Sequence, residues 1–263
     1  MLKLRRRLRL SQNFLRNRIL VRELVRRSSI GSIDLVLEIG PGEGIITREL
    51  LAVARRVVAV ELDDRLYCFL KKNFCGNRNL IIHQGDALRA PLPHGPYKVF
   101  ANIPFAIEGR LIRRLLHSSN PPDDCYLVVR KSVAERLAGL YREGLFSILH
   151  KPWFDFEITY RFRPSDFAPA TLVQPVLLRI TKGVPPLIAR DESDCYRQFI
   201  TQAFGGGRRL KQNLRRLMTP GELHQAAQKL GFSVDAMPSE LTFNQWIALF
   251  QTWRNGTTLS AGV

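Results

Sequence analysis

The fold is decided by the stretch Leu35-Val36-Leu37-Glu38-Ile39-Gly40-Pro41-Gly42-Glu43-Gly44, in which an apolar strand-like run passes directly into a loop with three glycines. Glycines let a ligand approach the backbone closely, and a helix that follows them supplies free N–H donors. The spacing is GxGxG, which differs from the GxGxxG of dinucleotide sites. Glu43 inside the loop would repel a pyrophosphate but tolerate a sulfonium cation.

The same alternation of apolar runs and helical patterns continues as far as about residue 130. Helical patterns separate runs that are β-branched or aromatic-rich and bounded by Gly, Pro, Asp or Asn, as buried parallel strands are. The expected strands are Leu35–Ile39, Val57–Leu62, Leu80–His83, Val99–Ile103 and Tyr126–Val129, and the expected helices are Thr47–Ala54, Asp64–Asn73 and Glu108–His117. This order predicts a doubly wound, Rossmann-like α/β sheet.

Two later runs, Asp155–Phe162 and Val173–Thr181, have no helical pattern between them. They predict an antiparallel pair at the sheet edge, where Pro175 is tolerated. Val184-Pro185-Pro186 then reads as a linker. Four helical patterns follow it, at Cys195–Phe204, Arg208–Leu217, Gly221–Leu230 and Phe243–Trp253. We therefore expect a catalytic domain over residues 1–182 and a small helical, RNA-binding domain over residues 183–263.

The charge balance points to a polyanionic partner. The 263 residues include 40 Lys and Arg against 23 Asp and Glu, a formal net charge of +17. Arginine outnumbers lysine, and it grips phosphate oxygens with two parallel hydrogen bonds. Nucleic acid is the natural partner of such a chain, the alternatives being a solvated basic face or adhesion to anionic lipid.

Other classes of protein fit the composition poorly. No window of eighteen apolar residues predicts a membrane span, and the basic N-terminus lacks the apolar core of a secretory signal, so we expect a cytoplasmic protein. The four cysteines show no CxxC pairing and no His at ligand spacing. Buried, reduced thiols and no metal site are the expectation.

Polar residues stand at four successive strand ends. Glu61 ends the second expected strand, about twenty residues after the glycine loop, where an acid can accept from a ribose diol. Because NAD and S-adenosylmethionine both carry that diol, this spacing alone leaves the two open. Asp86, after the third strand, can bond an adenine amino group or cap a helix. With Gly40 and Asn102 they predict a crevice at the carboxyl edge of the sheet.

Asn102-Ile103-Pro104-Phe105 follows the fourth expected strand, and its residue types can bind an exocyclic amine on a flat aromatic ring. The Asn carboxamide oxygen can accept from the amine, and Pro104 fixes its own φ so that the carbonyl before it can aim at the same nitrogen. Phe105 offers a face for a base to stack on. The tetrapeptide therefore predicts methylation of an amino group on a base. The alternative interpretation is a turn after a buried strand.

Together these residues resemble the rRNA adenine N6-dimethyltransferases, and most closely the Erm type, which modifies an adenine of 23S rRNA and confers macrolide resistance. The resemblance runs through Ser11–Leu15, the GPGEG loop, Glu61, Gly85-Asp86, Asn102–Phe105, Phe162–Pro169 and Trp246–Phe250. Small-subunit (KsgA-type) relatives share most of this, but they usually carry Leu where this chain has Ile103.

The resemblance implies S-adenosylmethionine as cofactor and an adenine of the peptidyl-transferase region of 23S rRNA as target. We also expect a monomer. The implied cofactor contacts are Asn13, Leu15, Gly40, Gly42, Glu61, Asp86 and Asn102. On the substrate side, Asn102 and the Ile103 carbonyl would orient the amine beside Pro104, and Phe105 and Phe167 would sandwich the base.

Two loops depart from the family pattern. Ala106–Gly109 stand where a Ser/Thr-containing segment is common, and Ala170 and Thr171 follow Pro169, where a second Pro is common. Both loops would face the substrate, so target choice, rate and the number of methyl groups stay open. The alternatives are a KsgA-type 16S rRNA methylase, an inactive RNA-binding assembly factor and, last, a nicotinamide oxidoreductase.

Overall fold

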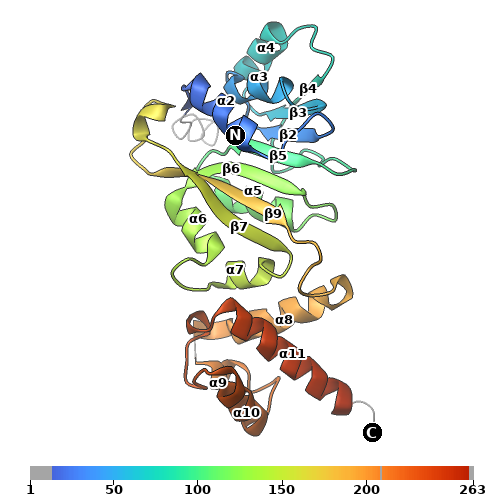
Figure 1. Cartoon of the computed structure of the whole chain (residues 1–263), viewed down its shortest axis with the longest axis vertical. Helices are drawn as coiled ribbons and strands as arrows, with labels where there is room; N and C mark the ends of the chain where they lie inside the picture. Colours follow the sequence, from blue (N-terminus) through green and yellow to red (C-terminus); the bar gives the residue numbers. More distant parts are fainter. Residues whose placement is uncertain (1–13, 208, 261–263) are drawn as a thin grey trace. The chain divides into compact units, whose positions relative to one another are not determined.

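The computed structural model describes residues 14–207 and 209–260 (Figure 1). The chain forms two compact units. The first contains the residues through Ala134 together with Phe156–Lys182, and the second contains Glu135–Asp155 and the residues from Gly183 onward. One junction between the units coincides with the expected boundary after Lys182. Residues 135–155, which we expected in the first domain, belong to the second unit.

A seven-stranded sheet in the order β4-β3-β2-β5-β6-β9-β7 confirms the expected doubly wound architecture. Strands β2 to β6 pair in parallel, and β9 pairs antiparallel with β6. The strands are β2 (Leu35–Ile39), β3 (Arg56–Glu61), β4 (Leu80–Gln84), β5 (Lys98–Asn102), β6 (Asp124–Arg130), β7 (Phe154–Arg161) and β9 (Pro175–Lys182). The helices of this part are α2 (Arg18–Arg27), α3 (Ile45–Leu51), α4 (Asp64–Asn73), α5 (Glu108–Leu116) and α6 (Lys131–Ala138).

The core of the first unit explains why the central strands read as continuous apolar runs. Val36 and Phe100 on the sheet pack in one cluster with Leu24 of α2 and Leu50 of α3. Neighbouring strand residues such as Val99 point to the other face and are also fully buried. Strands buried on both faces carry apolar residues at consecutive positions.

The antiparallel pair lies at the edge of the sheet, as expected, because β9 and β7 are its last two strands. The outermost strand is β7, and β9 lies between it and β6. Pro175 is tolerated there because it is the first residue of β9, where a missing N–H interrupts little of the ladder. Strand order of this kind depends on partners far apart in sequence, which periodicity does not reveal.

A two-residue ladder ties the start of the described chain to the loop before β9. In it, β1 (Phe14–Leu15) pairs antiparallel with β8 (Phe167–Ala168). Arg16 N continues the contact by donating to Asp166 O at 2.9 Å.

The second unit is helical, as expected. It contains α7 (Leu145–His150), α8 (Ser193–Ala203), α9 (Leu210–Asn213), α10 (Pro220–Leu230) and α11 (Phe243–Ser260). The expected helix over Arg208–Leu217 reduces to the four residues of α9. Thr219 caps α10 by accepting from Glu222 N, while the Glu222 carboxylate accepts from Thr219 N.

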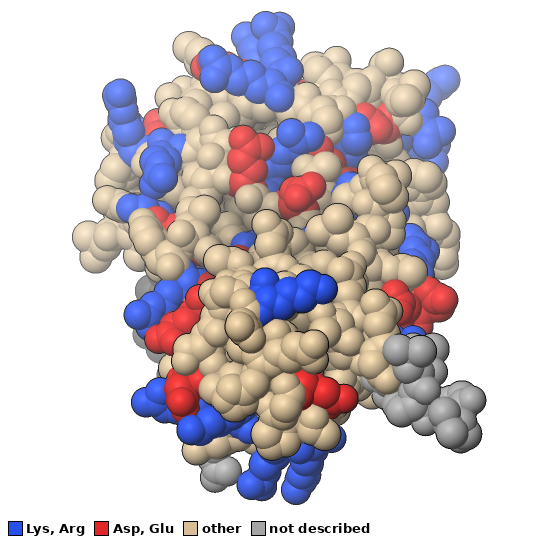
Figure 2. Space-filling model, turned by 60° about the horizontal axis from the view of Figure 1, so that its bottom comes forward, with Lys and Arg blue, Asp and Glu red and all other residues tan. Residues whose placement is uncertain are grey.

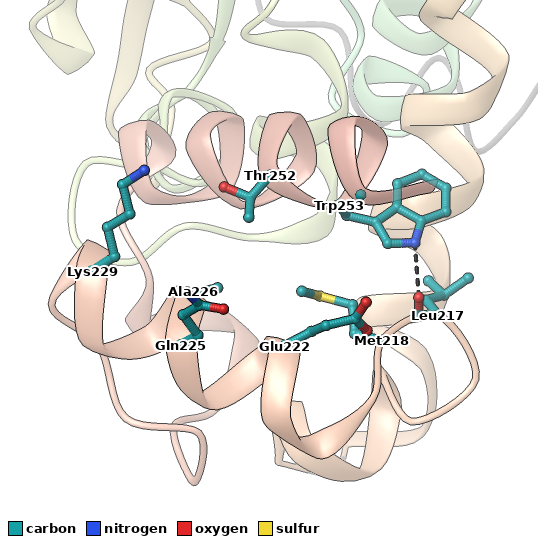
Figure 3. Close-up of a pocket in the computed structure, with 9 residues that line it drawn as sticks. Leu217, Met218, Glu222, Gln225, Ala226, Lys229, Thr252 and Trp253 are labelled. Carbon is teal, nitrogen blue, oxygen red and sulfur yellow. Dashed lines mark hydrogen bonds between the residues drawn. The ribbon is translucent and has the colours of Figure 1, made fainter. Parts of the chain in front are cut away.

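A cavity of about 330 Å³ lies between α10 and α11 (Figure 3). Its floor includes Met218 and Ala226, and Glu222 and Lys229 stand at its rim. Trp253 closes one end and donates its indole N–H to Leu217 O at 2.8 Å. None of the expected site residues lines this cavity.

The expectation of buried cysteines is wrong for two of the four. Cys125 is buried in β6, whereas Cys68 and Cys75 are exposed and Cys195 is half-buried. Both exposed thiols lie on or just after α4, whose outer face carries polar residues and whose single buried side chain is Leu70.

Candidate active site

Four strand ends lie side by side at the carboxyl edge of the sheet, where we expected a crevice. Gly40 N donates to Val60 O at 3.0 Å, and Gly85 N donates to Glu61 O at 2.8 Å. On the other side of β2, the backbone of Gly40 closely approaches that of Asn102, because a Cβ added at Gly40 would lie 3.9 Å from Asn102 O.

The glycine loop has the backbone that the sequence requires. Gly40, Gly42 and Gly44 have φ values of +66°, +59° and +79°, which glycine adopts without a steric penalty. A Cβ added at Gly42 would lie 2.8 Å from Cε1 of Phe14. The loop and β1 therefore touch closely, and α3 begins directly after Gly44.

Glu61 holds the glycine loop from the end of β3. Its Oε2 accepts from Gly42 N at 3.1 Å and its Oε1 accepts from Asp63 N at 2.9 Å. Burial raises the pKa of the carboxyl, and these backbone N–H groups oppose the rise. Each oxygen has a second lone pair, so the carboxylate keeps acceptor capacity for a hydroxyl.

Asp86 lies after β4 and is half-buried. Its Oδ1 accepts from Leu88 N at 2.9 Å, and its backbone carbonyl accepts from Arg89 N. The side chain therefore caps a turn and not a helix, which was the alternative expectation, because residues 86–90 form no helix. The contact with an adenine stays a prediction, which Oδ2 could satisfy.

Asn102 is the last residue of β5, and the loop that follows is held at both ends. Ile103 is buried and its N–H donates to Val128 O at 3.3 Å. Pro104 O accepts from Ile107 N at 2.9 Å. Phe105, between these anchors, is half-buried. The guanidinium of Arg130 lies 5.8 Å from the centroid of its ring.

Phe167 differs from the expectation that it stacks on the base. Its side chain is 1% exposed, and its ring packs edge-on against Phe162 with centroids 5.4 Å apart. It belongs to the core cluster under α2 and α3. In this structure the Phe167 ring offers no open face to a ligand.

A cavity of about 620 Å³ joins the loop residues and suits a nucleoside-sized cofactor. Leu15, Gly40 and Asn102, all expected cofactor contacts, line it. Gly42, Glu61 and Asp86 lie outside its lining, so their contacts with the cofactor stay predictions. Asn13 lies outside the described residues, so its contact stays a prediction. These residues fit S-adenosylmethionine, which would supply an electrophilic methyl group beside Asn102.

Sequence reasoning missed several residues of this site. Arg16, Arg18 and Arg48 also line the cavity and supply positive charge that can attract a carboxylate. The Arg18 side chain is already engaged, with its Nε 2.8 Å from Glu49 Oε1. The arginines carried no signal of their own because the whole N-terminal region is rich in this residue.

Glu38 is a further residue that could not be recognised from the sequence. It is fully buried in β2, and burial raises the pKa of its carboxyl to about 8. Thr47 of α3 lies close enough to lower the pKa again, yet neither carboxyl oxygen has a hydrogen bond of good geometry within the described part of the chain. An acid inside an apolar strand was the available signal.

Three further observations concern metals, membranes and charge. Within residues 14–207 and 209–260, no three His, Cys, Asp or Glu side chains gather as a metal site would require, and no helix is long and apolar enough to cross a bilayer. Figure 2 shows Lys and Arg side chains spread over the face it draws, with Asp and Glu among them.

Comparison with known proteins gives consistent matches over most of the chain. A profile of the ribosomal RNA adenine dimethylase family matches residues 3–254. The chain is 35% identical over 222 residues to ribosomal RNA small subunit methyltransferase A of Synechococcus sp. (strain JA-2-3B'a(2-13)), covering 81% of this chain and 78% of the relative. It is 28% identical over 246 residues to an rRNA adenine N-6-methyltransferase of Bacillus anthracis, covering 92% and 85%.

The fold matches the crystal structure of the 23S rRNA methyltransferase ErmE with a TM-score of 0.84 and 26% identity, covering 92% of this chain and 100% of that one. The glycine loop, the acid at the end of β3 and the Asn102–Phe105 loop occupy the edge of the sheet where such enzymes bind their ligands. The chain therefore belongs to the ribosomal RNA adenine dimethylase family and is an S-adenosylmethionine-dependent rRNA adenine N6-methyltransferase.

Proposed function

We propose that this protein methylates the exocyclic N6 of a flipped-out adenine in 23S rRNA and thereby confers macrolide–lincosamide–streptogramin B resistance. The observation that carries the proposal is the similarity to ErmE, which extends over that whole chain and so includes both units. Ile103, in place of the Leu that is usual in small-subunit relatives, favours the same target class.

The substrate side rests on the loop after β5. The Asn102 carboxamide oxygen and the Ile103 carbonyl would accept the two N–H groups of the adenine amine, turning the nitrogen lone pair toward the methyl group. Phe105 would stack on the base. Extruding an adenine from its stack costs a few kcal/mol, roughly, and stacking on one aromatic ring returns about 1–3 kcal/mol.

The cofactor side rests on the residues around the 620 Å³ cavity. Leu15 and the backbone of Gly40 and Gly42 would hold the amino-acid portion, Glu61 the ribose hydroxyls and Asp86 the adenine. No general base is required, since the N6 proton becomes acidic once nitrogen bears the new methyl group and then passes to water. The rate enhancement would come from holding the adenine amine and the methyl group in position for transfer.

The test is expression in a macrolide-sensitive bacterium, scored for resistance, with primer extension along both 23S and 16S rRNA. We expect resistance and blocked extension at a 23S adenine, and neither with Asn102→Ala. Blocked adenines confined to 16S rRNA, without resistance, would contradict the proposal.

A second candidate is methylation of 16S rRNA in the small subunit. The 35% identity to a small subunit methyltransferase A favours it. Purified protein separates the two when it is offered deproteinised 23S rRNA and immature small subunits in parallel, because each candidate predicts a different preferred substrate.

A further inference from the structure

An ion pair stands directly behind the aromatic ring that would receive the base. Glu108, the first residue of α5, is 1% exposed, and Arg130 is the last residue of β6. Glu108 Oε1 accepts from Arg130 N at 2.7 Å, and Glu108 Oε2 accepts from Arg130 Nε at 2.9 Å. The carboxylate therefore holds both the backbone and the side chain of Arg130.

Arg130 in turn reaches the Asn102–Phe105 loop at two points. Its Nη2 donates to Phe105 O at 3.3 Å, and its guanidinium lies over the Phe105 ring, 5.8 Å from the centroid. A guanidinium is planar and forked, so one group can satisfy a carboxylate and a carbonyl while stacking on a ring. These contacts fix the backbone of Phe105 and one side of its ring.

We propose that Glu108 and Arg130 are positioning residues that hold Phe105 at the height and tilt needed to stack the target adenine. This inference rests on the proposed function of the Asn102–Phe105 loop. Glu108 belongs to the segment Ala106–Gly109, which departs from the Ser/Thr-containing segment common in the family. The proposal gives this departure a physical role. Neither residue touches the reacting atoms.

The opposite end of β6 offers a matched control. Asp124 is the first residue of that strand, and its Oδ2 accepts from Arg179 Nη2 at 2.7 Å. The Arg179 guanidinium lies 5.6 Å from the centroid of the Tyr126 ring. Acid, arginine and ring are thus arranged alike at both ends of one strand, and one arrangement lies at the site whereas the other lies at the far edge of the sheet.

The experiment measures kcat, the KM for RNA and the melting temperature for Arg130→Gln, Arg130→Lys and Arg179→Gln, and for Arg130→Gln combined with Phe105→Ala. A small displacement of a positioned group can cost up to about 100-fold in rate, so we expect Arg130→Gln to lower kcat by about 10- to 100-fold. The KM for RNA should change by less than about threefold, because phosphate contacts dominate RNA affinity. Arg179→Gln should lower the melting temperature comparably but leave kcat within about twofold, since its ring lies away from the site.

Two variants separate positioning from charge and from general stability. In the Phe105→Ala background, Arg130→Gln should cost less than about twofold, because the group through which it acts is gone. Arg130→Lys retains the charge without the fork and should stay slow. Glu108→Gln/Arg130→Gln also removes the charge of the buried carboxylate that has lost its guanidinium in Arg130→Gln, and should recover the melting temperature but not kcat.

Several outcomes would overturn the proposal: full activity in Arg130→Lys, equal kcat losses in Arg130→Gln and Arg179→Gln, or an undiminished effect of Arg130→Gln without Phe105. All rates are measured on whichever rRNA the wild-type protein methylates. If that RNA is 16S, the proposed 23S function fails while the positioning role is still tested.

Discussion

At the scale of single residues, the site depends on a few polar groups with fixed partners. Glu61 bridges Gly42 and Asp63, Asn102 ends β5 beside Gly40, and Glu108 ties Arg130 to the Phe105 loop. Such groups are placed by backbone and side-chain contacts, so their substitution should affect positioning more than folding.

The first prediction concerns Asn102. Asn102→Ala should abolish methyl transfer, because the amine would lose the acceptor that orients its lone pair, while RNA affinity should remain near that of the wild type. Transfer of labelled methyl groups and RNA filter binding measure the two effects. Unchanged turnover would remove Asn102 from the mechanism.

The second prediction concerns pH and Glu38. Its pKa is raised from 4.5 to about 8 by burial, so the folded protein holds a proton that the unfolded chain has lost. This contribution to stability is complete below pH 4.5 and is lost as the pH rises toward 8. Glu38→Gln should therefore flatten the decline of melting temperature across that range.

Glu49 is the control, because its pKa is shifted in the opposite direction from that of Glu38. Burial would raise the pKa of its carboxyl, but hydrogen bonds from Arg18 and Arg22 outweigh it and leave the pKa lowered. Its contribution is present above the ordinary pKa and is lost on acidification. Glu49→Gln should alter the acid side of the melting profile and leave the side above neutrality as in the wild type. Identical profiles for wild type and Glu38→Gln would sink the burial argument.

At the scale of elements, the loop between β2 and α3 makes the most restrictive demand on sequence. Gly42→Ala would need a φ of +59° and would bring a methyl group to 2.8 Å from the Phe14 ring. We expect S-adenosylmethionine affinity to fall by about tenfold or more, since strain in αL costs roughly 1–2 kcal/mol before the clash is counted. Isothermal titration measures it.

Gly95→Ala is the matched control, because a Cβ there meets nothing within 4 Å. It should bind the cofactor as the wild type does. Equal affinity in Gly42→Ala and the wild type would show that the loop and Phe14 can separate without loss.

The sequence predicted the helices and strands themselves better than it predicted which elements lie next to each other in space. Buried parallel strands such as Leu35–Ile39 and the helix Asp64–Asn73 were found at their observed bounds, because apolar runs and helical spacing are local signals. The helix α2 was missed, since its buried Leu20, Val21, Leu24 and Val25 alternate with arginines that read as a basic arm. The edge position of the pair β9 and β7 was predicted, but the sequence did not show that β7 is the outer strand, because strand order is a long-range property.

The residues of the site likewise divide into those that the sequence could predict and those that it could not. Gly40, Glu61 and Asn102 could be placed at neighbouring strand ends because parallel strands share one carboxyl edge. The burial of Phe167 and the Glu108–Arg130 pair could not be foreseen. Both arise from packing between segments that periodicity does not connect.

At the scale of the whole molecule, the second unit is completed by a segment from the middle of the chain. Tyr196 Oη donates to Ile148 O at 2.9 Å, and the Trp153 indole N–H donates to Ile188 O at 3.0 Å. Ile148 and Trp153 belong to the same apolar cluster as Tyr196 and Phe250. The catalytic sheet is thus interrupted by residues whose partners come after Lys182.

The fourth prediction follows from that arrangement. A chain ending at Lys182 should leave Ile148 and Trp153 without partners, and it should bind hydrophobic dyes and self-associate. Tyr196→Phe in the full chain loses one hydrogen bond and should cost only about 1 kcal/mol of stability. A monodisperse fragment that melts as the full protein does would contradict the division into units.

The ladder between β1 and β8 has a consequence for how a ligand leaves the cofactor cavity. Phe14, Leu15 and Ala168 form part of the cavity wall, and among the described residues the ladder between their two segments has two residue pairs, which the Arg16 N–Asp166 O hydrogen bond continues. Short ladders open at a lower free energy than central strands. We therefore expect the wall on this side to open at a lower free energy than β5, so that a spent nucleoside would leave there without disturbing the base-binding loop.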